Sequence, residues 1–210
     1  SFIPVLARLA IELGLFEKER GGLLCQDSDG GNVIQNLLYH DSFHTHNQDH
    51  REEYHLQVLI ELRKMGLLKK KDIIRYDLLD LVCCQYFYFA EKQFQFLVEW
   101  DPNSLWEKNR HDGRLPLHHA ALHRTMQGFQ YVFEYGIRYY PNKKGINLLF
   151  QQNIIGQTPF QLACEEHGRD AVMKVIEDTL TRYSDTPLNI VDALITAAID
   201  ENVHLDCVYF

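Results

Sequence analysis

GRLPLHHAA at residues 113–121 is repeated as GQTPFQLAC at residues 156–164. In each stretch a turn glycine comes first, a proline follows three residues later, and a small residue, Ala120 or Ala163, stands four positions after the proline. An aliphatic stripe follows both stretches. Self-similarity of this kind indicates a stack of structural repeats, each burying its apolar face against its neighbour, and it disfavours a closed catalytic core.

A third copy of the pattern follows downstream. Ala163 lies 43 residues after Ala120, and Ala197 lies 34 residues after Ala163. In the third copy Asn202 takes the place of Gly168, at a turn between two helices that requires a left-handed backbone. Glycine and asparagine adopt this conformation most easily.

Upstream, the same order of a polar turn and an apolar helix recurs twice. Residues 27–38 contain a glycine turn followed by an apolar stretch, and residues 55–65 supply a partner helix that ends at Gly66. Residues 77–84 predict a short helix and residues 94–98 a second one. The repeats are therefore expected to extend through the whole chain.

The two stretches resemble the ankyrin repeat family, whose unit of about 33 residues is a β-turn followed by two antiparallel helices with the signature T-P-L-H-x-A. The matching residues are Thr158, Pro159 and Phe160 in one repeat and Pro116, Leu117, His118 and Ala120 in the other. The resemblance implies an all-α solenoid of helical hairpins with short β-turn fingers. Residues 1–210 would form a single domain of about five units, the first and the last incomplete.

The chemistry of the signature agrees with this interpretation. Proline at the first helical position costs no hydrogen bond, and Thr158 is expected to cap its helix. Leu115 replaces this threonine in the first stretch, and Gln161 replaces the histidine in the second. In the family, the histidine at the position of His118 braces the turn by hydrogen bonds, so the resemblance implies a structural role for it here.

Small residues are expected where helices meet. Ala120 and Ala163 would let the two helices of a repeat approach closely, and Val172, Val175 and Ile176 recur at helical spacing toward the next repeat. The structural repeat motif then comprises the following residues: Gly113, Pro116, His118, Ala120, Gly156, Thr158, Pro159, Ala163 and Gly168.

The composition favours an intracellular protein. The chain has 210 residues, 46% of them hydrophobic, with a net charge of −8, which argues against nucleic acid as a partner. Five cysteines without CxxC spacing indicate reduced thiols and a cytoplasmic or nuclear location. No apolar run is long enough to span a membrane, so no membrane association is expected. Both ends interrupt the pattern, which suggests a fragment of a longer protein.

Candidates for metal binding or catalysis are weak. His46 and His50 in the histidine-rich segment 40–55 are four residues apart, and Asp49 or His44 would be the further ligand, but a solvated loop is the preferred interpretation. The histidines around His118 have no nucleophile nearby in the sequence, and no phosphate-binding or hydrolase motif occurs. We therefore expect no enzyme activity, no metal and no cofactor.

The basic run 69–71 follows two leucines and is interpreted as a solvated helix C-terminus, where cations favour the helix dipole. A contact with phosphate or an acidic peptide is the minority alternative.

An insertion is the best candidate for a functional site. The spacing of 43 residues exceeds the family's repeat length by about ten residues, which places an insertion at 136–152. Basic and aromatic residues there are expected to lie on a loop and contact a partner, whereas residues 148–150 would fold back over the stack; both interpretations stay open. The predicted partner-binding residues are Arg138, Tyr139, Tyr140, Lys143, Lys144 and, from the preceding turn, Trp106.

The sequence thus favours a non-catalytic scaffold that binds another protein through its finger loops and concave helix face. The alternative is a regulatory or targeting repeat segment of a larger enzyme. A histidine-dependent hydrolase is poorly supported. The identity of the partner is not encoded in any of these features.

Overall fold

The computed structural model describes residues 2–39, 48–85, 88–123, 125–141 and 143–183. These residues are mostly helical and contain no strand; an isolated bridge joins Gln26 and Asn32. The all-α prediction is therefore confirmed. The predicted repeat around Ala197 and Asn202 lies outside the described residues. The chain divides into two compact units, 1–101 and 102–210.

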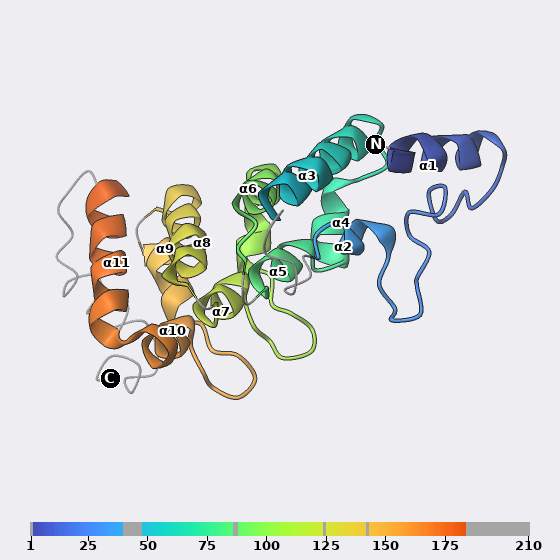
Figure 1. The fold of residues 1–210 in the computed structure, drawn as a ribbon. Coiled ribbons are helices and arrows are strands. Elements are labelled where there is room, and N and C mark those ends of the chain that lie inside the picture. The colour runs from blue at the N-terminus through green and yellow to red at the C-terminus, as the bar shows by residue number, and fades with distance from the viewer. Residues whose placement is uncertain (1, 40–47, 86–87, 124, 142, 184–210) are drawn as a thin grey trace. The chain divides into compact units, whose positions relative to one another are not determined.

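The described part of the first unit contains α1 to α6 (Figure 1). Their bounds, in chain order, are Phe2–Glu12, Val33–Asn36, Gln48–Lys64, Lys70–Arg75, Leu78–Cys83 and Glu91–Trp100. α3 packs against α6 and α1, and α5 packs against α6 and α4. The helices predicted at 55–65, 77–84 and 94–98 are present as α3, α5 and α6, whereas α4 was not predicted.

Two buried carboxylates form hydrogen bonds between segments of the first unit that are distant in sequence. Asp72 in α4 is fully buried and accepts hydrogen bonds from both terminal guanidinium nitrogens of Arg20, at 2.5 and 3.0 Å, and from the backbone N–H of Lys69 at 2.7 Å. Glu52 in α3 accepts the backbone N–H of Lys92 at 2.7 Å, so it caps the N-terminus of α6 from a neighbouring helix.

The interpretation of the basic run 69–71 as a helix C-terminus is wrong. α3 already ends at Lys64, and Gly66 follows with a left-handed φ of 70°. Lys69 is instead the N-cap of α4, and the basic side chains lie in the first turn of that helix. Asp72 at the third helical position starts the new helix, because its carboxylate takes up the N-cap N–H.

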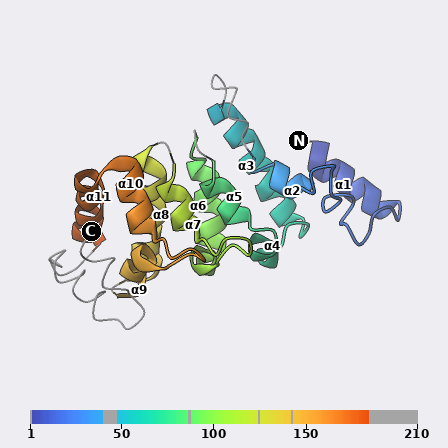
Figure 2. The ribbon, with the colours of Figure 1, turned by 90° about the horizontal axis from the view of Figure 1, so that it is seen from below.

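The described part of the second unit contains two helix pairs that stack on one another. The bounds of its elements are Pro102–Trp106 (η2), Pro116–Ala121 (α7), Met126–Tyr139 (α8), Lys143–Ile146 (α9), Asn147–Phe150 (η3), Pro159–His167 (α10) and Arg169–Tyr183 (α11). α7 pairs with α8 and α10 with α11, while α7 packs on α10 and α8 on α11. In Figure 1, α8 and α11 stand side by side, and Figure 2 shows the same pairs from below. Equivalent helices of the two pairs therefore contact one another.

A turn with a defined hydrogen-bond pattern precedes α10. In this turn, which we call turn C (153–157), the N–H of Asn153 donates to the carbonyl of Gln157 at 3.0 Å, and the N–H of Gly156 donates back to Asn153 at 3.1 Å. Gly156 has a φ of 83°, which only glycine adopts without strain. Thr158 and Gln161 then form a reciprocal capping box at the start of α10, so the predicted cap by Thr158 is confirmed.

The same pattern occurs before α2 in the first unit. In turn A (27–31) the N–H of Asp27 donates to Gly31 at 2.8 Å, and the N–H of Gly30 donates to Asp27 at 3.1 Å. Asn32 and Gln35 form the capping box that follows. The sequence pattern at 27–38 thus produces the same local structure as the one at 153–161.

Turn B (109–114), before α7, is one residue longer. The N–H of Asn109 donates to the carbonyl of Arg114 at 2.7 Å, and Gly113 has a φ of 68°. Leu115 has no side chain for capping, but its own N–H donates to Nδ1 of His118 at 2.9 Å. His118 therefore takes the role that the glutamine plays in the two other turns.

The predicted small residues lie in the core. Ala120 and Ala163 are fully buried, as close helix contacts require. Gly168 ends α10 with a φ of 82°, as its place between two helices predicted. Val172 and Ile176 of α11 are also buried.

The insertion is helical where a loop was predicted. α8 continues to Tyr139 because its buried stripe of Phe129, Phe133 and Ile137 repeats at four-residue intervals. Arg138 accordingly lies on a helix, and Lys143 and Lys144 lie on α9. The prediction of a loop for these three cations is wrong.

Candidate functional site

A cluster of cations and aromatic rings forms where α8, α9 and η2 meet. The ammonium of Lys144 lies 4.1 Å from the ring centroid of Tyr140 and 5.6 Å from that of Trp106. The two rings meet edge to face with centroids 6.2 Å apart, and the Tyr140 hydroxyl donates to Asn103 at 3.0 Å. The predicted residues Tyr140 and Lys144 are thus brought together with Trp106, which precedes Tyr140 by 34 residues.

Arg138 lies in the last turn of α8, two residues before Tyr140. Its guanidinium lies 5.5 Å from the ring centroid of Tyr135, and the ring of Tyr139 lies 6.2 Å from that of Tyr135. Arg138, Lys143 and Lys144 are exposed. We use the name cationic patch for Arg138, Lys143 and Lys144 with Trp106 and Tyr140.

The cationic patch rests on a tightly packed base. Leu148, Leu149 and Phe150 are buried, so this part of the insertion does cover the stack. A Cβ on Gly145 would lie 2.3 Å from the carbonyl oxygen of Tyr140, and one on Gly136 would lie 2.5 Å from a methyl of Leu148. Because a side chain at position 145 would collide with the backbone of Tyr140, the position of α9 against the end of α8 is closely defined.

Turn C presents an apolar tip next to turn B. Ile154 and Ile155 are 71% and 69% exposed, while the backbone N–H of Ile154 donates to the carbonyl of Asp112 at 3.1 Å. The ammonium of Lys108, directly before turn B, donates to the carbonyl of Gln152, directly before turn C, at 2.9 Å. The tip is therefore exposed on a backbone that is held by hydrogen bonds.

His118 forms hydrogen bonds to Leu115, directly after turn B, and to Gln157 of turn C. Its imidazole is fully buried, Nδ1 accepts the N–H of Leu115, and Nε2 lies 3.2 Å from the carbonyl of Gln157. Because Nδ1 accepts, the ring is neutral with its proton on Nε2, which donates to Gln157. Burial lowers the pKa of His118 to about 4. This geometry is a structural brace, as the resemblance implied.

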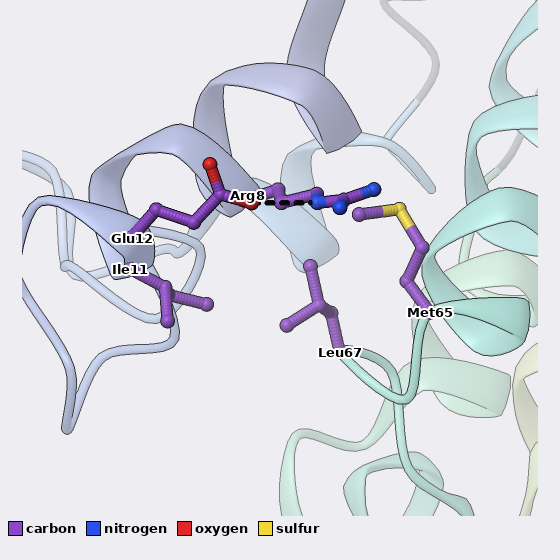
Figure 3. Close-up of a pocket in the computed structure, with 5 residues that line it drawn as sticks. All are labelled: Arg8, Ile11, Glu12, Met65 and Leu67. Atoms are coloured by element: carbon purple, nitrogen blue, oxygen red, sulfur yellow. Dashed lines mark hydrogen bonds and ion pairs between the residues drawn. The ribbon is translucent and has the colours of Figure 1, made fainter.

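A second apolar surface lies on α1 in the first unit. The exposed large side chains on α1 and directly after it are Phe2, Val5, Leu6, Leu9, Leu13, Leu15 and Phe16. Beside them a pocket of about 390 Å³ is lined by Arg8, Ile11, Glu12, Met65 and Leu67 (Figure 3). Arg8 donates to Glu12 at 2.9 Å along one wall. The pocket was not predicted from the sequence.

The histidine-rich segment is only partly described. His40, His44 and His46 lie outside the described residues, whereas Asp49 and His50 lie in the first turns of α3. Within the described ranges no group of three potential metal ligands comes together. Cys25, Cys83, Cys84 and Cys164 are unpaired thiols.

Comparisons with family models, with curated proteins and with solved structures each give no match for this chain. Among the described helices, none is long and apolar enough to cross a membrane.

The structure therefore brings together three of the six partner-binding residues selected from the sequence, and it adds new candidates. Trp106, Tyr140 and Lys144 form one cluster, and Arg138 lies on the neighbouring turn of α8 beside Tyr139. The apolar tip of turn C was missed. Two adjacent isoleucines directly before Gly156 were the available signal, because a predicted polar turn has no reason to contain them.

Proposed function

We propose that this chain is a non-catalytic, ankyrin-like repeat module that binds another protein. Turns B and C would correspond to the fingers of the family, and α7 and α10 to the helices that line the concave face. The observation that carries the proposal is the stacking of α7–α8 on α10–α11, with the turns before α7 and α10 joined by the hydrogen bond from Ile154 to Asp112.

Stacked hairpins of this kind create an extended surface from short, similar pieces, and that surface is what repeat proteins use for recognition. Turn C supplies the apolar part, since Ile154 and Ile155 are exposed on an ordered backbone. A binding loop that is already held in place loses little conformational entropy when it binds. The exposed isoleucines are thus suitable anchors for a partner protein.

The proposal is tested with the double variant Ile154→Ser/Ile155→Ser. Proteins captured from native extract by the 210-residue chain would be identified, and the most enriched one purified and titrated directly. We expect the variant to retain its helical circular dichroism and to lose most of its affinity for that protein.

The matched control is Val5→Ser/Leu6→Ser, which removes a similar exposed apolar area from α1 in the other unit. Equal affinity of the wild type, the turn C variant and the control would exclude turn C as the binding surface.

A further inference from the structure

The described part of the insertion carries positive charge on an acidic protein. Between Glu134 and Glu165 the sequence contains three basic residues and no acidic one, although the chain as a whole has a net charge of −8. All three are exposed on α8 and α9. The local charge is therefore opposite in sign to that of the whole protein, which favours an acidic partner at this place.

Two of the three cations of the patch lie against aromatic rings. Lys144 lies over Tyr140 and within 5.6 Å of the Trp106 centroid, and Arg138 lies beside Tyr135. Within the part of the chain that the structure describes, neither Arg138 nor Lys144 is paired with a carboxylate. A cation over an aromatic face keeps its charge and has fewer conformations to lose on binding.

We propose that the cationic patch is a second binding surface, which takes an acidic segment of a partner protein. The proposal rests on the proposed function in that it treats the chain as a protein-binding module, but it concerns residues other than those of turn C. Carboxylates of the segment would pair with Arg138, Lys143 and Lys144, and its apolar side chains would pack on Trp106 and Tyr140.

The chemistry favours a short peptide over larger polyanions. Three cations are fewer than the four to eight basic residues that typically hold a protein on an anionic membrane, and fewer than the phosphate contacts of typical DNA-binding proteins. A duplex or a vesicle would also bring many phosphates close to the rest of a chain with net charge −8. A short acidic segment contacts the patch without this repulsion.

The test measures binding of a fluorescein-labelled peptide with the repeating sequence Glu-Glu-Leu-Ser to the full chain by fluorescence anisotropy. A Gln-Gln-Leu-Ser peptide, a DNA duplex and phosphatidylserine vesicles serve as competing ligand classes. The patch variant is Arg138→Ser/Lys143→Ser/Lys144→Ser. The matched control is Lys18→Ser/Lys64→Ser/Lys174→Ser, which makes the same change in net charge at exposed positions elsewhere.

We expect the patch variant to bind the acidic peptide about tenfold more weakly, and the control to stay within about twofold of the wild type. Equal weakening by both variants would mean that only net charge matters and would overturn the proposal. Absence of acidic-peptide binding, or patch-dependent binding of DNA or vesicles in preference to the peptide, would overturn it as well.

A second readout does not depend on the triple variant. The chain has two tryptophans, so Trp100→Phe leaves Trp106 as the only source of tryptophan emission. The acidic peptide is expected to change this emission, and Lys144→Met to abolish the change. An unchanged emission spectrum at saturating peptide would refute contact with the patch.

The proposal for turn C and the proposal for the cationic patch can be refuted independently of each other. Ile154→Ser/Ile155→Ser is expected to bind the acidic peptide as the wild type does. Loss of peptide binding in this variant would show that turn C, and not the patch, takes the peptide.

Discussion

The sharpest prediction concerns the pH dependence of stability and the brace residue His118. The neutral imidazole accepts the N–H of Leu115 and donates to Gln157, and burial lowers its pKa to about 4 from the ordinary 6.5. In the unfolded chain the same side chain binds a proton near pH 6.5. The unfolded state therefore binds more protons between these two values, and stability falls as the pH falls.

The magnitude follows from the two pKa values. The contribution of His118 is complete above about pH 6.5 and decreases as the pH falls toward 4. The linkage relation gives a loss of about 2 kcal/mol at pH 5 and about 3 kcal/mol at pH 4, relative to pH 7. Below the folded-state pKa the loss levels off, because both states then carry the proton.

The test compares the wild type with His118→Gln by urea unfolding from pH 7 to pH 4. Glutamine is the matched replacement, because Gln35 and Gln161 accept the N-cap N–H at the equivalent positions, each at 3.0 Å. The variant is expected to lose about 1 kcal/mol at pH 7, since it gives up the bond to Gln157.

From pH 7 to pH 4 the wild type is expected to lose about 3 kcal/mol more than the variant. Carboxylates elsewhere titrate in both proteins, so their contributions to the pH dependence of stability cancel in the comparison. Parallel pH profiles for the two proteins would refute the assignment of His118 as a buried, neutral brace.

Three further changes test the packing. Ala163→Leu overpacks a fully buried helix contact and is expected to cost about 1–3 kcal/mol or more, so an unchanged melting curve would contradict the position of α10. Gly145→Ala places a Cβ 2.3 Å from the carbonyl oxygen of Tyr140 and is expected to cost about 1–3 kcal/mol by chemical unfolding; a neutral effect would mean that α9 does not pack closely on α8. Asp72→Ala removes the carboxylate partner of the largely buried Arg20 guanidinium, which then keeps only its hydrogen bond to the carbonyl of Leu67, and is expected to cost about 3 kcal/mol in thermal unfolding. A loss under about 0.5 kcal/mol would show that the pair is solvated.

The sequence predicted the local structure well wherever backbone chemistry determines it. Gly156, Thr158 and Pro159 specify a left-handed residue, a cap and a first helical residue, and the structure has all three. The two glycines of residues 27–38, Gly30 and Gly31, likewise predicted the turn before α2. These features depend on neighbouring residues, so a single sequence contains the necessary information.

What the sequence did not predict depends on contacts between distant residues. The placement of Lys144 over Tyr140 and Trp106 follows from the packing of α9 on α8. The start of α4 at Lys70 depends on Asp72, whose partner Arg20 lies 52 residues away. Periodicity within a short window contains no signal for any of these.

The claim that turns B and C form the binding surface is tested most directly by hydrogen exchange. Exchange would be measured by mass spectrometry on the chain alone and in complex with the protein purified by capture. The account predicts slower exchange at 109–114 and 153–157 in the complex, with α1 unchanged. Protection confined to α1 and its pocket, with both turns exchanging as in the free chain, would contradict it.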